Sequence, residues 1–212
     1  MAVTLEERRA TSRIVMVRHG QTEWSLSGQH TSVTDLPLTA VGEEEARRVG
    51  RALRSREFGL ILSSPRQRAL RSAELAGYAD VVQVDPNLVE WDYGAYEGLT
   101  TKEIVAQRGS RWDLWADGVP PGASPGVSPG ETAAEVQVRA RAVIARSMPE
   151  LDAGRTVLLI AHAHILRAIA VAWVDLPARD GTIFALSTST VSELGFEHER
   201  HAILKWNAPV AP

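Results

Sequence analysis

The sequence predicts an α/β protein, a three-layer sandwich with a central, mostly parallel mixed sheet and helices on both faces. The first basis for this prediction is that short apolar runs alternate with longer amphipathic stretches along most of the chain. Such runs are typical of strands buried on both faces, and the stretches between them suit crossover helices. The second basis is that core-type segments resume directly after the one Pro/Gly-rich loop, residues 117–131, which favours one domain over residues 1–212.

The first part of the chain begins this alternation. Residues 14–17 (IVMV) predict a buried strand, residues 39–58 an amphipathic helix, and residues 59–64 (GLILSS) a second strand. The expected apolar stripe of the helix consists of Val41, Ala46, Val49 and Leu53. A strand, a helix and a second strand in this order predict a parallel pair of strands with a right-handed crossover.

The segment after the second strand contains helix-boundary signals. Ser64 is the expected N-cap, Pro65 suits the first helical position, and Gly77 suits the C-terminal stop. Residues 80–85 (DVVQVD) predict a third strand, and a further helix is expected near residues 100–109.

The second part of the chain contains a Pro/Gly-rich loop, residues 117–131, and we expect a lid or a surface loop excursion over residues 110–130. Residues 131–148 predict a helix, residues 155–174 a strand, a turn and a helix, and residues 182–206 two or three short strands, some of them antiparallel. The face of the 131–148 helix that we expect to be buried consists of Ala134, Val138, Ala142, Ala145 and Met148.

The composition excludes several classes of function. No cysteine is present, which excludes disulfides, thiolate metal sites and a cysteine nucleophile. The net charge of −3 argues against a general nucleic-acid surface. The polar tail 1–12 lacks the apolar stretch of a signal peptide, and no apolar run reaches the length of a membrane span. We therefore expect a cytoplasmic protein that binds neither nucleic acid nor membrane, and the sequence leaves a homodimer open.

Three predicted strands end on residues that suit an anion. Arg18 and His19 follow the strand 14–17, Arg66 follows the second strand, and His162 follows the apolar run VLLIA. Because ligands of open α/β sheets bind beyond the carboxyl ends of the strands, these side chains should converge if the strands are neighbours. Arg66 would also lie in the first turn of its helix, where free N–H groups favour an anion.

A phosphate is the group best suited to such a pocket, because guanidinium forks match its oxygens. Binding alone does not need a histidine at the strand end, whereas an imidazole there can attack phosphorus if its nitrogen is unprotonated. We expect the flanking arginines to lower the pKa of His19 through repulsion between like charges. The leaving alkoxide also needs a proton donor, for which Glu90 is the first candidate, with Asp92 and Glu97 as alternatives.

Four motifs carry a resemblance to a known family. They are VRHGQTEW, SSPRQRALRSAELA, LVEWDYGAYEGLT and IAHAHILR. In this order and spacing they resemble the histidine phosphatase superfamily, in its phosphoglycerate-mutase-like branch, and the resemblance extends from about residue 13 to residue 206. Within the branch the chain looks most like broad-range and sedoheptulose-bisphosphatase-like phosphatases. This resemblance implies a phosphoric monoester hydrolase of the histidine acid phosphatase type, acting on small phosphorylated metabolites such as sugar phosphates.

The resemblance also implies roles for individual residues. His19 matches the nucleophile, which becomes a phosphohistidine, and Glu90 matches the general acid. Arg18, Arg66 and His162 match the residues that bind and neutralise the phosphoryl oxygens. No metal and no other cofactor is implied, because the charges of arginine and histidine replace a cation in stabilising the transition state.

Departures from the mutase pattern favour a phosphatase, while a cofactor-dependent phosphoglycerate mutase and a non-catalytic phosphate-binding protein remain alternatives. Ser25 stands where the mutases carry asparagine, and residues 31–33 are Thr-Ser-Val instead of Thr-Gly-Trp. Ala163 stands where glycine is usual. The natural substrate is not predicted. The candidate substrate-binding residues are Gln21, Thr22, Ser25, His30, Thr31 and His164.

Some of these residues also have an interpretation without function. We interpret Arg68 and Arg71 as part of a solvated helix face. His162 and His164 have a spacing that could suit a metal, since imidazoles are common ligands. No further cluster of His, Asp or Glu in the sequence completes a coordination set, so no metal site is predicted.

Overall fold

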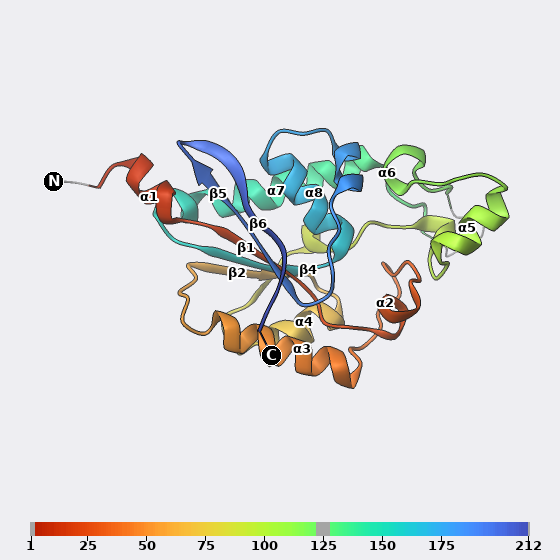
Figure 1. Ribbon diagram of the computed structural model, residues 1–212, viewed down its shortest axis with the longest axis horizontal. Coiled ribbons are helices and arrows are strands. Elements are labelled where there is room, and N and C mark those ends of the chain that lie inside the picture. The colour runs from red at the N-terminus through yellow and green to blue at the C-terminus, as the bar shows by residue number, and fades with distance from the viewer. Residues whose placement is uncertain (1–2, 122–127, 212) are drawn as a thin grey trace.

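The computed structural model describes residues 3–121 and 128–211 (Figure 1). Its six-stranded sheet has the strand order β3-β2-β4-β1-β5-β6. The strands are β1 Ile14–Arg18, β2 Leu60–Ser63, β3 Gln83–Val84, β4 Val157–Ala161, β5 Thr190–Glu197 and β6 Arg200–Pro209. The pairs among β1, β2, β3 and β4 are parallel, whereas β5 is antiparallel to β1 and β6 to β5. The predicted α/β class with a mostly parallel mixed sheet is confirmed.

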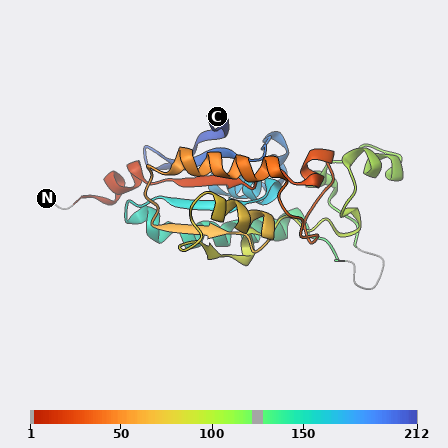
Figure 2. The ribbon, with the colours of Figure 1, turned by 90° about the horizontal axis from the view of Figure 1, so that it is seen from below.

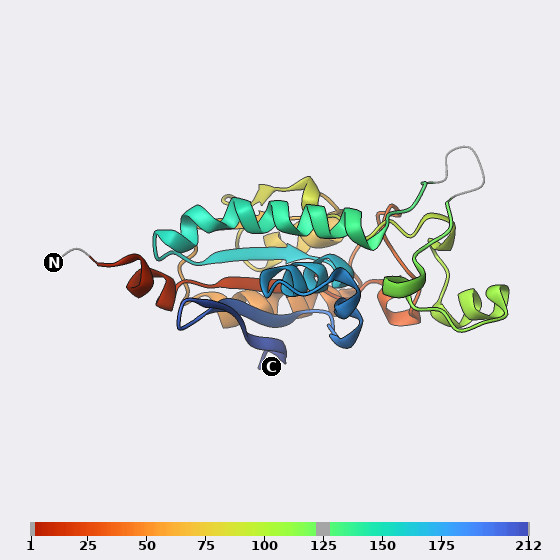
Figure 3. The same cartoon turned by 90° about the horizontal axis from the view of Figure 1, so that it is seen from above.

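Helices cover both faces of the sheet and complete the three layers. On one face lie α3 (Ala40–Leu53) and α4 (Gln67–Leu75), which Figure 2 shows in front of the sheet. On the other face lie α7 (Ala133–Asp152) and α8 (Ala163–Trp173), which are in front in Figure 3. The central parallel strands β1 and β4 are therefore buried between two helical layers, whereas the edge strand β3 is exposed.

The apolar residues of β1 pack in both directions. Ile14 and Met16 belong to the core cluster that contains the α8 side chains. Val15 and Val17 belong to the cluster on the side of α3 and α4. A strand covered on both faces is apolar at every position, which explains why the apolar run stops where the chain leaves the sheet at His19.

Shorter helices lie around this sandwich. They are α1 Leu5–Thr11, α2 Glu23–Ser27, α5 Thr101–Arg108, α6 Leu114–Asp117 and the 3₁₀ helices η1 Pro86–Leu88, η2 Gly94–Tyr96 and η3 Ala178–Ile183. The segments that contain α2, α5 and α6 lie together at one end of the sheet (Figure 1). Backbone hydrogen bonds join two of them: the His30 N–H donates to the Leu99 carbonyl at 2.9 Å, and the Gly98 N–H donates to the His30 carbonyl at 2.9 Å.

Two predicted helix faces differ from the structure. The helix predicted over residues 39–58 ends at Leu53, and Val41 of its expected stripe is 53% exposed. In α7 the expected face is wrong, since Val138 is 68% exposed. The buried residues of α7 are Val136, Ala140, Val143, Ser147 and Leu151. Small apolar residues occupy both sides of this helix, so helical spacing alone could not choose between them.

The start of α4 also differs from the prediction. The helix begins at Gln67 with Arg66 as N-cap, so Ser64 is not its cap and Pro65 is not helical. The Gln67 N–H donates instead to the Asp35 carboxylate at 2.9 Å. Gly77 follows the helix end in the left-handed region with a φ of 94°, as predicted.

Two expected segments contain more regular structure than predicted. The polar tail 1–12 forms α1, in which Arg9 pairs with Asp152 at 2.7 Å. The expected lid 110–130 includes α6, and residues 122–127 lie outside the described residues. Among the described helices, none combines the length and the apolar character needed to cross a membrane.

Candidate active site

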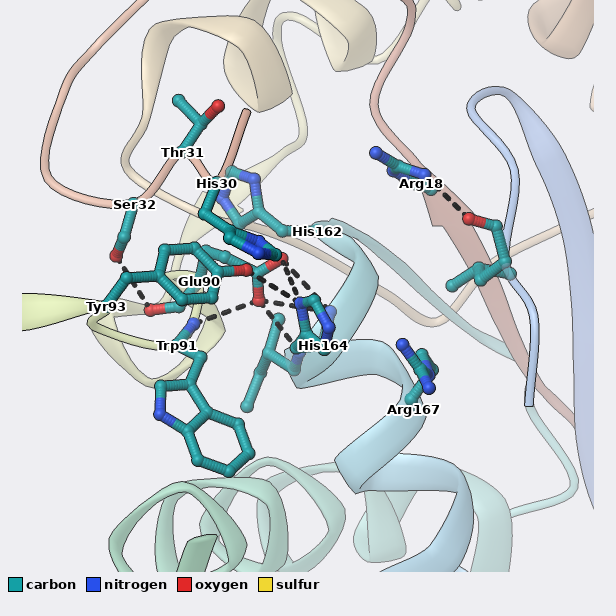
Figure 4. A network of polar contacts seen from close by, with 12 residues as sticks. Arg18, His30, Thr31, Ser32, Glu90, Trp91, Tyr93, His162, His164 and Arg167 are labelled. Carbon is teal, nitrogen blue, oxygen red and sulfur yellow. Dashed lines mark hydrogen bonds and ion pairs between the residues drawn. The ribbon is translucent and has the colours of Figure 1, made fainter. Parts of the chain in front are cut away.

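A pocket of about 220 Å³ lies beyond the carboxyl ends of the parallel strands. Arg18 and His19, at the end of β1, line it together with Glu90, from the loop after η1, and His164, from the first turn of α8. β1 and β4 are adjacent and parallel, so their ends meet at this edge of the sheet. Of the strand-end residues expected to converge, His19 and His162 lie with 5.1 Å between their ring centroids, whereas Arg66 does not line the pocket. Figure 4 shows part of the resulting network.

His19 is held in one tautomer. Its Nδ1 lies 2.7 Å from the carbonyl oxygen of Gly20, which can only accept, so Nδ1 carries the proton. Its backbone N–H donates to the carbonyl of Ala161 at 2.9 Å, which ties the end of β1 to β4. A neutral imidazole protonated at Nδ1 keeps a free lone pair on Nε2. The His19 side chain is therefore set up to act as a nucleophile through Nε2.

The surroundings of His19 keep it neutral. Burial lowers the pKa of His19 well below its ordinary value, and the charges of Arg68 and Arg18 lower this pKa further. Lowering by neighbouring cations was predicted, but the second cation is Arg68, where Arg66 was expected. An imidazole with a lowered pKa retains its lone pair at neutral pH.

Arg68 is fully buried, at 0% exposure, so its interpretation as part of a solvated helix face is wrong. Its Nε donates to Nδ1 of His162 at 3.1 Å, and its terminal nitrogens donate to the carbonyls of Thr34 at 3.1 Å and Thr31 at 3.2 Å. Because Nδ1 of His162 accepts a hydrogen bond, the proton of the neutral ring lies on Nε2. That atom is 2.7 Å from Ser64 Oγ.

The neighbouring arginines have different places. Arg71 makes ion pairs at the surface with Glu43 and Glu74, as expected for a solvated position. Arg66 is the N-cap of α4, does not line the pocket, and has a buried Nε without a hydrogen-bond partner among the described residues. The difference from the prediction follows from the later start of α4, which turns Arg68 rather than Arg66 toward His162.

Glu90 is 4% exposed and is held by the start of α8. Its carboxylate accepts backbone N–H groups of Trp91 at 2.9 Å, His164 at 3.0 Å and Ile165 at 3.0 Å. Burial acts to raise the pKa of Glu90, but the hydrogen bond and charge of His164 outweigh it and hold this pKa well below its ordinary value. Glu90 is therefore ionised in the free protein.

His164 connects Glu90 to an aromatic wall. The Tyr93 hydroxyl lies 2.7 Å from Nδ1 of His164, which is also 3.6 Å from the Glu90 carboxylate. Burial lowers the pKa of His164, which the Glu90 carboxylate acts to raise, and burial raises the pKa of Tyr93 well above its ordinary value, so the tyrosine keeps its proton. The His30 ring packs on Tyr93 with 4.8 Å between ring centroids, and burial lowers the pKa of His30 to about 4.

Of the other predicted substrate-binding residues, three line the pocket and one does not. Thr22, Ser25 and Thr31 line the pocket. Thr22 and Ser25 also form the capping box of α2, so their hydroxyls already have partners within the protein. Gln21 does not line the pocket, and its side-chain oxygen accepts from the Thr39 hydroxyl at 2.9 Å.

Two arginines of this region were missed or misread in the sequence. Arg68 lies at helical spacing with the buried Ala69, Ser72 and Ala73, and that spacing was the available signal. Arg167 lines the pocket from α8, one turn after His164. An i, i+3 spacing from a candidate site residue on a helix could have identified it.

Metal-ligating side chains are not clustered in the part of the chain that the structure describes. No group of three or more His, Asp or Glu residues there has an arrangement that could hold a metal ion. Both histidines of the His162-x-His164 pair have protein partners: His162 contacts Arg68 and Ser64, and His164 contacts Tyr93 and Glu90.

Comparison with known proteins places this pocket in a family. The chain is 38% identical to an acid phosphatase of Mycobacterium tuberculosis over 188 residues, which cover 88% of this chain and 87% of that protein. It is 38% identical to sedoheptulose 1,7-bisphosphatase of Saccharomyces cerevisiae over 194 residues, covering 78% of this chain and 69% of that protein. The solved structure of an open reading frame product from Mycobacterium tuberculosis matches with a TM-score of 0.85 and 35% identity, covering 94% of this chain and 99% of that chain.

Residues 14–209 match the family model of the histidine phosphatase superfamily, branch 1. The matched segment includes every strand of the sheet and every residue described above as lining the pocket. Identity at this level over most of the chain establishes the family that the four motifs indicated. The chain belongs to branch 1 of the histidine phosphatase superfamily and is a phosphatase, a phosphoric monoester hydrolase.

Proposed function

We propose that this phosphatase hydrolyses phosphomonoesters of small metabolites without a metal ion, in two steps through a phosphohistidine on Nε2 of His19. The observation that carries the proposal is the hydrogen bond between His19 Nδ1 and the Gly20 carbonyl, 2.7 Å long. It leaves Nε2 unprotonated, in a pocket lined by Arg18 and close to the charge of the buried Arg68. An unprotonated nitrogen beside cations is what attack on an anionic phosphorus centre requires.

In the first step Nε2 of His19 forms a bond to phosphorus while the bond between phosphorus and the ester oxygen breaks. The charge of the transferring group spreads over its three equatorial oxygens. Arg18 and Arg68 supply positive charge next to His19, and the His162 Nε2–H can turn from Ser64 Oγ to a phosphoryl oxygen. We assign the phosphate-binding role to Arg18, Arg68 and His162, and give Arg66 a supporting position beside Arg68.

Glu90 supplies the proton that the leaving oxygen needs. In the free protein this carboxylate is ionised. A bound phosphate ester adds negative charge close to it, and a nearby like charge raises a carboxyl pKa. Glu90 can therefore take up a proton as the substrate binds and donate it to the departing alkoxide, which leaves as an alcohol.

In the second step water attacks the phosphohistidine. Glu90, now a carboxylate again, accepts a proton from the water as its oxygen bonds to phosphorus and the bond between phosphorus and Nε2 breaks. Inorganic phosphate and neutral His19 result. The pocket of about 220 Å³ supports a small substrate, because sites for larger ligands usually span about 300–1,000 Å³.

The decisive experiment traps the intermediate. Wild-type protein is mixed with a ³²P-labelled phosphomonoester and quenched in alkali, which preserves the acid-labile phosphohistidine. We expect label on His19, no label in His19→Ala, and loss of p-nitrophenyl phosphate hydrolysis in that variant. His198→Ala is the matched control, since the His198 side chain is 91% exposed and distant in sequence from the pocket motifs.

Two results would refute this proposal. One is hydrolysis that persists in His19→Ala, and the other is hydrolysis by the wild type that a chelator abolishes. The assay also distinguishes a phosphatase from the two alternatives that the sequence left open, a mutase and a non-catalytic phosphate-binding protein. Interconversion of 2- and 3-phosphoglycerate with a bisphosphorylated primer, without net release of phosphate, would indicate a mutase. Binding of phosphate without any labelled intermediate or turnover would indicate a non-catalytic protein.

A further inference from the structure

Arg167 is a cation of the pocket that the proposed chemistry does not use. It lies on α8 and lines the pocket together with Arg18, His30 and His164. Figure 4 shows Arg18 and Arg167 on one side of this region and Tyr93 and Glu90 on the other. The space between the two sides is where a substrate would extend from the phosphate-binding residues.

The guanidinium of Arg167 is only partly satisfied. Its Nε donates to the carbonyl of Gly181 at 2.9 Å, and its central carbon lies 5.1 Å from the ring centroid of Trp115. Within the described residues its two terminal nitrogens make no hydrogen bond, and no carboxylate lies within 4.0 Å of them. A half-buried guanidinium with free N–H donors is suited to bind an anion bidentately.

The position of Arg167 separates it from the phosphoryl group. His162 precedes the first residue of α8 and Arg167 follows five positions later, which corresponds to about 7–8 Å along the helix axis. The hydrogen bond to Gly181 of η3 and the contact with Trp115 hold the side chain away from His162. Arg167 is therefore placed to contact the part of the substrate that leaves.

We propose that Arg167 binds a second anionic group, a carboxylate or a phosphate, on the leaving part of the substrate. The preferred substrates are then phosphomonoesters of small metabolites that carry additional negative charge. This proposal rests on the proposed function and narrows its substrate class. Arg167 is then a residue that determines substrate specificity, because its positively charged guanidinium group recognises the second anionic group.

Two matched pairs of substrates test this assignment. 3-Phosphoglycerate and glycerol 3-phosphate differ by a carboxylate in place of a hydroxymethyl group. Fructose 1,6-bisphosphate and fructose 6-phosphate differ by the second phosphate. We expect the wild type to prefer the more anionic member of at least one pair by about 10- to 100-fold in kcat/KM, the range of one charged hydrogen-bonding interaction. The pair that shows the preference identifies carboxylate or phosphate.

Arg167→Gln should remove this preference, lowering kcat/KM for the more anionic substrate at least ten times more than for p-nitrophenyl phosphate. Arg167→Lys should retain part of it. Arg179→Gln is the control, because Arg179 lies on η3 with a side chain 76% exposed. A wild type without preference in either pair overturns the proposal, whether or not the variants fold. So does an equal loss of activity toward all substrates in Arg167→Gln. Failure of the proposed function would give a different result: His19 would carry no label after reaction with p-nitrophenyl phosphate.

Discussion

The Nε atom of Arg68 donates a 3.1 Å hydrogen bond to Nδ1 of His162, and both side chains are at most 1% exposed. The bond fixes His162 as the tautomer with its proton on Nε2. Arg68 also donates to the carbonyls of Thr31 and Thr34, which lie in the loop between α2 and α3. One buried guanidinium thus orients a candidate phosphate-binding histidine and anchors the loop beside the pocket.

Replacing this arginine should damage both activity and stability. We expect Arg68→Gln to lower kcat/KM for p-nitrophenyl phosphate by about 100-fold or more, since charge stabilisation of a transition state is typically of this size. The free energy of unfolding should fall by about 2–4 kcal/mol, because buried carbonyls lose their donor. Steady-state kinetics and urea denaturation measure the two effects.

The neighbouring arginines provide the comparison. Arg71→Gln should change the free energy of unfolding by no more than about 0.5 kcal/mol, because its ion pairs are at the surface. Arg66→Gln should lower kcat/KM less than Arg68→Gln does. The reverse order of these two variants would mean that Arg66 binds the phosphoryl group and that Arg68 has a structural role.

Glu90→Gln should slow the enzyme in a way that depends on the leaving group. Glutamine keeps one oxygen that can accept from the N–H groups at the start of α8, but it cannot donate a proton as a carboxylic acid does. We expect a fall in kcat of about 10²–10⁴ for an alkyl phosphate, the usual range for loss of a general acid. The fall should be smaller for p-nitrophenyl phosphate, whose leaving group needs little protonation. Equal losses for both esters would argue against proton donation by Glu90.

The fold and the strand-end residues could be predicted because they depend on local patterns. Strands buried on both faces give uninterrupted apolar runs, and such a run ends where the chain meets the pocket at Arg18 and His19. The order of the strands was not predicted, since β4, from late in the chain, lies between β1 and β2. His162 was identified as a strand-end residue and Glu90 as the first candidate proton donor, and both lie near His19, with 5.1 Å between the ring centroids of His19 and His162.

Identifying the remaining site residues requires knowing which face of each helix points inward, and a sequence pattern constrains this rotation only weakly. A start of α4 two residues later than predicted turns Arg68 inward and leaves Arg66 as the cap. The same ambiguity led to the wrong buried face of α7, where alanines occur all around the helix. Arg167 lies one helical turn after His164, but its contact with the carbonyl of Gly181 in η3 was not evident from the sequence. Such contacts join segments that no local pattern connects.

The folded protein should lose stability as the pH falls below about 6.5. Burial lowers the pKa of His30 from 6.5 to about 4, whereas an unfolded chain binds the proton near 6.5. Between these values the unfolded state binds more protons, so the free energy of unfolding decreases as the pH falls. Burial also lowers the pKa values of His19 and His162, which act in the same direction.

His30→Gln isolates one of these contributions. At about 1.36 kcal/mol for each pH unit, His30 should account for roughly 2 kcal/mol of the stability lost between pH 6.5 and pH 5. Urea denaturation at pH 7 and pH 5 should therefore show a smaller decrease for His30→Gln than for the wild type. His198→Gln, at an exposed position, should leave the decrease unchanged. An identical decrease in His30→Gln and wild type would show that His30 titrates alike in both states.

Gly42→Ala should disturb the nucleophile from a distance. A Cβ on Gly42 would lie 2.1 Å from the carbonyl oxygen of Gln21, a backbone contact that cannot be relieved by side-chain movement. Gln21 adjoins Gly20, whose carbonyl holds the proton of His19 Nδ1. We expect a loss of about 1–3 kcal/mol in the free energy of unfolding, typical of overpacking, together with a lower kcat for p-nitrophenyl phosphate. Val41→Ala, at a neighbouring position that is 53% exposed, is the control and should change both quantities little. If Gly42→Ala behaves like Val41→Ala, α3 can shift away from Gln21 without moving His19.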